Sequence, residues 1–98
     1  MTRTIEIINP ATVTANSDQT CGVDADNVSG LVNAIRAGKT LPPAIVVREW
    51  MEVRDGCHRL AAAKATGTML AVIFISRDEY QSMRDDGVAD CDLTDEIA

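Results

Sequence analysis

The spacing of hydrophobic residues changes several times along this 98-residue chain, and each change predicts a new element. Isoleucines alternate with polar residues over 4–10, which is typical of a short strand, here ended by Pro10. The stretch 11–23 is polar and aperiodic, and a connection of that length is either functional or disordered. Over 24–37 the apolar residues recur at helical spacing, so we expect a helix that ends at Gly38. Its apolar face would consist of Val28, Leu31, Val32 and Ile35.

The middle of the chain predicts a hairpin followed by a second helix. The apolar run 44–47 indicates a buried strand, and the alternating residues 50–53 indicate a partner strand across a tight turn. An alanine-rich helix over 57–66 follows, closed by Gly67. Small side chains of this kind let a helix pack closely against a sheet.

The last third of the chain predicts one more strand and one more helix. The continuous apolar run 69–75 is typical of a central strand that is covered on both faces. Ser76, with Glu79 three residues later, forms a capping box for a final helix that ends at Gly87. The acidic residues 88–98 are expected to fray.

These elements follow the order β-α-β-β-α-β-α, which predicts an α+β fold with a small mixed sheet flanked by helices. The connection from 50–53 through the alanine-rich helix to 69–75 is long enough for a right-handed parallel crossover. A chain of this length forms one domain. We therefore assign 1–87 to a single domain and 88–98 to an acidic C-terminal tail.

The composition indicates a cytoplasmic protein with free thiols. No stretch has the apolar length of a membrane span, and the N-terminal apolar run is too short for a signal peptide, so we expect no membrane partner. The three cysteines, Cys21, Cys57 and Cys91, are far apart and odd in number, which argues against a disulfide framework and against a zinc site. The sequence does not indicate an oligomeric state.

The net charge of −6 is concentrated at the C-terminus. Residues 77–98 hold eight acidic residues against two arginines, whereas the acidic and basic residues of 1–76 balance. Broad, non-specific nucleic-acid binding depends on the neutralisation of phosphates, and this overall charge gives it no support.

The stretch Asp55-Gly56-Cys57-His58-Arg59 is the strongest candidate for a site. A glycine between a strand and a helix aims the free N–H groups of the helix outward, and those groups form an anion site. Gly56 would permit the sharp turn and the close approach of a phosphate. Arg59 would reach back to the phosphate with its planar donors, and a protonated His58 would add another. Lys64, further along the helix, is expected to be solvated.

Cys57 has two interpretations that the residues alone leave open. A thiol at a helix N-terminus beside a histidine and an arginine is where a reactive thiolate is expected. The alternative is a small residue that fits a tight turn.

The motif at 55–67 resembles the D-G-x-H-R-x-x-A-x-x-x-x-G signature of the ParB/sulfiredoxin superfamily, which includes ParB-like nuclease domains and free-serine kinases. Residues 28–47 resemble the superfamily's preceding helix, proline-marked turn and strand, and 8–10 its first strand. The resemblance implies a nucleotide or phosphate site at Gly56, His58 and Arg59. It also implies, from the sulfiredoxin sequence G-C-H-R, a nucleophilic role for Cys57.

The chain also departs from that pattern. Where sulfiredoxins carry a lysine, a serine and a threonine that contact the nucleotide, this chain has Asn27, Gly30 and Ala34. The G-E-R-R motif of the ParB partition proteins is replaced by Gly56-Cys57-His58-Arg59. The free-serine kinases and ParB-like nucleases depend on a glutamate as base or metal ligand. In this chain the candidates for that residue are Glu6, Glu49 and Glu52.

Three functions remain open at this point. The first is nucleotide binding, of ATP or another NTP with Mg²⁺, with hydrolysis or phosphotransfer in which Asp55 or Glu6 orients the attacking group. The second is a non-enzymatic accessory protein, of the plasmid or phage type, that binds a protein or nucleic-acid partner. The third is a sulfiredoxin-like reductase with Cys57 as its nucleophile.

Overall fold

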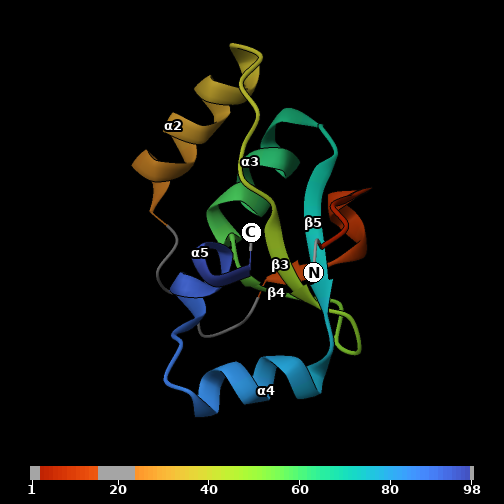
Figure 1. The fold of residues 1–98 in the computed structure, drawn as a ribbon. Coiled ribbons are helices and arrows are strands. Elements are labelled where there is room, and N and C mark those ends of the chain that lie inside the picture. Colours follow the sequence, from red (N-terminus) through yellow and green to blue (C-terminus); the bar gives the residue numbers. More distant parts are fainter. Residues whose placement is uncertain (1–2, 16–23, 98) are drawn as a thin grey trace.

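The computed structural model describes residues 3–15 and 24–97, which form a five-stranded mixed sheet with helices on both faces (Figure 1). The strands are β1 (Glu6–Ile8), β2 (Thr14–Ala15), β3 (Ala44–Val47), β4 (Glu52–Asp55) and β5 (Leu70–Ile75). The α-helices are α2 (Ala25–Arg36), α3 (Cys57–Thr66), α4 (Arg77–Asp85) and α5 (Leu93–Ile97), and the 3-10 helices are η1 (Pro10–Thr12) and η2 (Asp90–Asp92). The α+β fold with a mixed sheet is confirmed.

The strand order β1-β5-β3-β4-β2 puts β3 at the centre of the sheet. β3 runs parallel to β5 and antiparallel to β4, while β1 is antiparallel to β5 and β2 is parallel to β4. β4 and β5 therefore run in opposite directions on either side of β3. The predicted parallel crossover through α3 is wrong, because α3 connects β4 and β5, which run in opposite directions.

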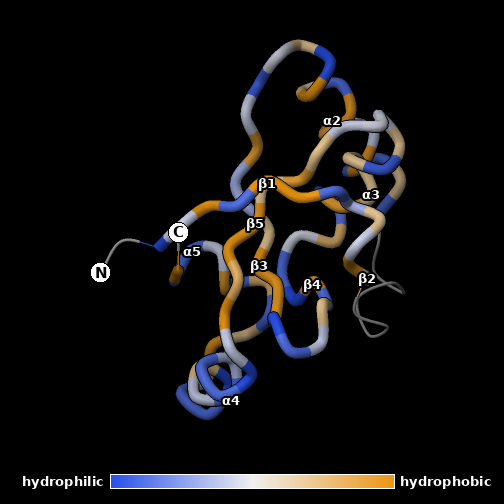
Figure 2. Tube along the Cα trace, turned by 90° about the vertical axis from the view of Figure 1, so that its right-hand side faces the viewer, coloured by the Kyte–Doolittle hydropathy of each residue, from blue (hydrophilic) through white to orange (hydrophobic). Residues whose placement is uncertain are grey.

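The alternation of side chains along β3 explains why a run of four apolar residues is buried on both faces. Ala44 and Val46 face a cluster that includes Leu60 of α3, whereas Ile45 and Val47 face a cluster built with α4 and α5. Figure 2 shows these strands as a hydrophobic centre beside the hydrophilic helix α4. The interpretation of 44–47 and 69–75 as strands covered on two faces is confirmed.

The predicted helix at 24–37 is present, but α2 packs mainly against α3 (Figure 1). None of its residues is fully buried, so its apolar face is only half covered. α3 in turn packs on the sheet through Leu60 and the small side chain of Ala63, both buried.

Strand β4 differs from its predicted bounds. Trp50 and Met51 lie in the turn 48–51, so β4 begins at Glu52 rather than at residue 50. Met51 takes a left-handed conformation with φ of 49°, and the Trp50 ring packs edge-on against Tyr80 at 5.9 Å between ring centroids. The apolar residues that indicated a strand are thus turn residues: Trp50 contacts α4, while Met51 packs against the cluster on the α3 face of the sheet. In the stretch 11–23, η1 and β2 occupy the first part, and 16–23, including Cys21, lie outside the described residues.

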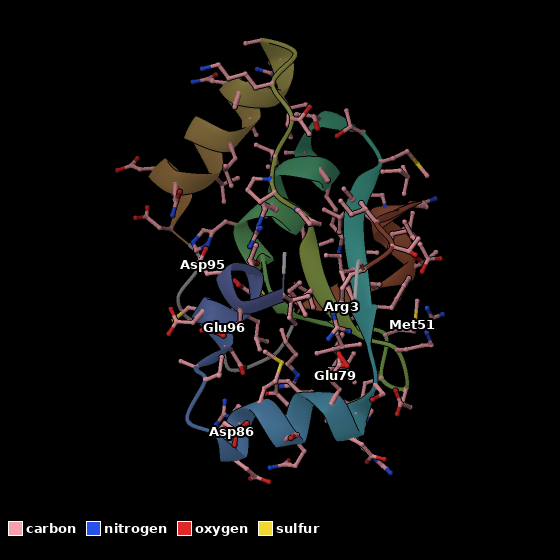
Figure 3. The ribbon with its side chains drawn as sticks, viewed as in Figure 1. Arg3, Met51, Glu79, Asp86, Asp95 and Glu96 are labelled. Atoms are coloured by element: carbon pink, nitrogen blue, oxygen red, sulfur yellow. The ribbon has the colours of Figure 1, made fainter. Side chains whose placement is uncertain are left out.

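The C-terminal segment packs onto the domain, so the expectation that it frays is wrong for residues 88–97. Ser76 caps α4 as predicted, accepting a hydrogen bond from the Glu79 N–H, while the Glu79 carboxylate pairs with Arg3 (Figure 3). Beyond α4 the chain turns back through η2 into α5. Leu93, the first residue of α5, has no exposed surface and packs on the β3–β5 face with Tyr80.

Candidate functional site

The motif residues lie at the junction between β4 and α3, as the sequence predicts. Gly56 separates the strand from the helix and has φ of 108°, a backbone conformation that L-residues rarely adopt. At the other end Gly67 closes α3 in the left-handed conformation.

Gly56 is also required by its contact with β3. A Cβ at this position would lie 2.8 Å from the Ala44 Cβ and 3.0 Å from the Arg59 Nε. The space beside Gly56 is therefore filled by the protein itself. The predicted turn is confirmed, but this side of Gly56 packs against a neighbouring strand and offers no room for a phosphate.

A cavity of about 370 Å³ opens at the start of α3. The N-cap Gly56 has no side chain to cap this helix, and the residues of its first turn that line the cavity place the positive end of the helix dipole there. The C-terminal third of the chain supplies the opposite wall. The lining residues are Asp55, Gly56, Cys57, His58, Arg84, Asp90 and Cys91.

Arg59 is held inside the fold. Its NH1 donates to the carbonyl oxygens of Pro42 and Pro43 at 3.2 and 3.0 Å. Its NH2 donates to Asp55 Oδ1 at 3.3 Å and to Thr94 Oγ1 at 3.1 Å. The side chain is only 13% exposed, and burial lowers the pKa of the guanidinium while the Asp55 carboxylate opposes that shift. Arg59 is therefore enclosed by the fold rather than extended toward solvent.

Asp55 is the centre of this network. Its Oδ2 accepts from the Thr94 N–H at 2.8 Å and from the Thr94 hydroxyl at 2.6 Å, while its Oδ1 accepts from Arg59. Buried carboxylates usually accept several hydrogen bonds in this way, because a buried charge without partners is energetically costly. Asp55 therefore joins β4, α3 and α5.

His58 braces the start of α2. Its Nε2 accepts a hydrogen bond from the Asp24 N–H at 3.0 Å, so this nitrogen carries no proton in that arrangement. Asp24 is itself the cap of α2, accepting from the Asp26 N–H. For His58 to donate to an anion through Nε2, as predicted, the hydrogen bond from the Asp24 N–H would have to break.

The two described thiols differ in access. Cys57 is 5% exposed, whereas Cys91 is exposed, and both line the cavity. A reactive thiol must be reached by its substrate, so the packing interpretation of Cys57 is the one that its burial supports.

The predicted glutamates lie elsewhere. Glu6 pairs with Arg48 at 3.3 Å in a separate cavity beside β1, and it does not reach the start of α3. Glu49 accepts from the Arg77 N–H at the start of α4, and Glu52 pairs with Arg54. None of the three lines the α3 cavity.

The cavity residues do not fit a magnesium ion. Magnesium needs one or two free carboxylates beside the phosphates of its ligand. Asp55 is engaged by Arg59 and Thr94, and Asp90 Oδ1 accepts from the Tyr80 hydroxyl at 2.8 Å and from Arg84 at 3.0 Å. Over 3–15 and 24–97, no group of three histidine, cysteine or acidic residues could hold a metal ion.

Arg84, Asp90 and Thr94 also belong to this site, although the sequence did not indicate them. Tyr80 and Arg84 lie one helical turn apart on α4, and both contact Asp90, which closes the cavity. The helical spacing of Tyr80 and Arg84 was visible in the sequence, but nothing in it indicated that Asp90 and Thr94 fold back onto the motif.

No family model matches the chain, and no curated protein matches it. Among solved structures, a Pnob8-like ParB-N domain matches with a TM-score of 0.64 and 22% identity over 87% of this chain. The match covers 34% of that protein, so this chain spans about a third of its neighbour's length. In the described part of the chain, no helix has both the length and the apolar character to cross a membrane.

Proposed function

We propose that this protein, which has the fold of a ParB-N domain, binds a phosphate-bearing ligand in the cavity at the start of α3. The observation that carries the proposal is that α3 begins at a glycine, which has no capping side chain, and that its first residues line a cavity together with other signature residues. Backbone N–H groups and the helix dipole favour anions at such a position. The volume of about 370 Å³ suits the phosphate end of a nucleotide better than a whole nucleoside triphosphate.

Arg84 is the cation that supports this site. It reaches the cavity from α4, and its side chain is 49% exposed, so it can turn from Asp90 toward a ligand. Arg59, the arginine of the signature, instead braces the motif from behind. Phosphate recognition would therefore depend on Arg84 and the α3 backbone.

The proposal is limited to binding. Asp55 would have to accept a proton or orient an attacking group for phosphotransfer, yet its two oxygens already accept three hydrogen bonds. The occupied Asp55 carboxylate is why the proposal is for anion binding without phosphotransfer.

Calorimetric titration with inorganic phosphate, ATP and CTP tests this proposal. We expect saturable binding that Arg84→Gln weakens about tenfold, as for the loss of one charge-assisted hydrogen bond. Arg36→Gln is the matched control, because Arg36 is an exposed arginine in the last turn of α2. An absence of heat with all three ligands would contradict the proposal.

A non-enzymatic accessory role is the second candidate, and the folded acidic surface favours it. Asp86, Asp95 and Glu96 are exposed on the side of the molecule formed by α4 and α5 (Figure 3). Fixed negative charge on folded elements suits a basic protein partner better than nucleic acid. Retention of DNA by the protein at low salt would argue against this acidic-surface role.

A further inference from the structure

The terminal donors of Arg59 are fully used within the fold. A guanidinium carries four N–H groups on its two terminal nitrogens. The four acceptors are the carbonyls of Pro42 and Pro43, the Asp55 carboxylate and the Thr94 hydroxyl. An anion can therefore use a terminal nitrogen of Arg59 only after one of these four contacts has been released.

Thr94 is the one acceptor of the four that comes from the C-terminal segment. The two proline carbonyls belong to the backbone that enters β3, and Asp55 is an oppositely charged partner from the neighbouring strand. The Thr94 hydroxyl is neutral and comes from α5, a helix of only five residues. The Thr94 hydroxyl also donates to Asp55, so its contact with Arg59 opens when α5 moves away and both bonds break together.

The same segment forms a wall of the cavity. Asp90 and Cys91 of η2 line it, while Leu93 anchors the segment in the apolar cluster with Tyr80. Withdrawal of η2 and α5 would thus widen the cavity and free one donor of Arg59 together.

We propose that residues 90–97 form an autoinhibitory latch, in which Thr94 keeps Arg59 from an anionic ligand. This inference rests on the proposed phosphate site. With the latch closed, an anion meets the α3 backbone and Arg84. With the latch withdrawn, NH2 of Arg59 becomes available as an additional donor.

Thr94→Val tests the latch, because it removes the hydroxyl but keeps the shape and the backbone N–H that bonds Asp55. Thr94→Ser, which keeps the hydroxyl, is the matched control. We expect Thr94→Val to bind inorganic phosphate about tenfold more tightly than the wild type, and Thr94→Ser to bind like the wild type. Phenylglyoxal, an arginine-specific dicarbonyl, should modify Arg59 faster in Thr94→Val, as read by peptide mass spectrometry.

The outcomes separate the latch from the site. If the wild type binds phosphate and Thr94→Val binds it equally or less well, the latch is overturned and the site stands. If neither protein binds phosphate, the proposed function itself fails, and the latch with it. Should Thr94→Val not fold, Ile97→Ala weakens the anchoring of α5 from its half-buried end and must raise the affinity in the same direction; an unchanged affinity overturns the latch.

Discussion

Asp55 and Thr94 are joined by two hydrogen bonds to one carboxylate oxygen, across 39 positions of sequence. Through this contact the last helix is attached to the residue that opens the signature motif. The same carboxylate holds Arg59, so the motif, the proline turn and the C-terminal segment form one polar network inside the domain. We therefore expect this network to stabilise the folded protein as well as to position the residues of the site.

Asp55→Asn should destabilise the protein by roughly 2–4 kcal/mol, since an amide cannot accept all three hydrogen bonds and leaves Arg59 without its counter-charge. Urea unfolding followed by circular dichroism measures this loss. Asp78→Asn, at a side chain that is 90% exposed, is the control and should change the free energy of unfolding very little. Equal effects of the two substitutions would show that the network does not stabilise the fold.

Gly56→Ala should cost about 2–5 kcal/mol, because it combines an unfavourable backbone conformation with a contact of 2.8 Å to Ala44. Gly30→Ala is the matched control inside α2, where a new Cβ meets nothing within 4 Å. That substitution should raise stability by about 0.5–1 kcal/mol through helix propensity. The melting temperature should fall in Gly56→Ala and rise in Gly30→Ala. A change in the same direction in both variants would show that Gly56 is not required by its backbone conformation and its contact with Ala44.

The strength of the motif as a sequence signal has a local physical cause. Glycine marks both ends of α3 because the backbone there has positive φ, and the alanines between them favour a closely packed helix. The strands 44–47 and 69–75 were likewise readable, since only burial on both faces explains unbroken apolar runs.

The remainder depended on contacts between distant residues. Trp50 and Met51 imitate the alternation of a strand although they pack from a turn. Leu93 is one apolar residue in an acidic stretch and shows no periodicity, yet it is completely buried. From its position in the helix, Arg59 was expected to have free donors. Its acceptors, the proline carbonyls and Thr94, lie 16 or more positions away in the sequence, so the local pattern did not reveal them.

Tyr80 should titrate above its usual value of about 10. Burial raises the pKa of its hydroxyl, the hydrogen bond to Asp90 raises it further, and Arg54 and Arg84 oppose the shift. The neutral Tyr80 hydroxyl therefore adds to the free energy of unfolding. This contribution is fully present at pH values below the pKa of tyrosine in the unfolded chain, and it is lost as the pH rises through the pKa of Tyr80 in the folded protein. Tyr80 is the only tyrosine, so tyrosinate absorbance reports it directly.

Asp90→Asn should move that titration midpoint downward, since the Tyr80 hydroxyl loses a charged acceptor. A midpoint that does not change would mean that Tyr80 and Asp90 are not bonded in solution.

The thiols should differ in alkylation when Cys21 is replaced by serine. In native buffer, iodoacetamide should label the exposed Cys91 and leave the buried Cys57 unmodified until urea unfolds the chain. Mass spectrometry of peptides locates the label. Rapid labelling of Cys57 in the native protein would restore the nucleophile interpretation and its sulfiredoxin-like chemistry.

An anion bound at the start of α3 would change the chemical shifts of the backbone amides that contact it. A titration of ¹⁵N-labelled protein with inorganic phosphate should shift the amide signals of Cys57 and His58 saturably, and more weakly in Arg84→Gln than in Arg36→Gln. Signals of α2 residues near Arg36 should stay in place. Amides at the start of α3 that do not respond, or shifts of equal size in both variants, would contradict the account.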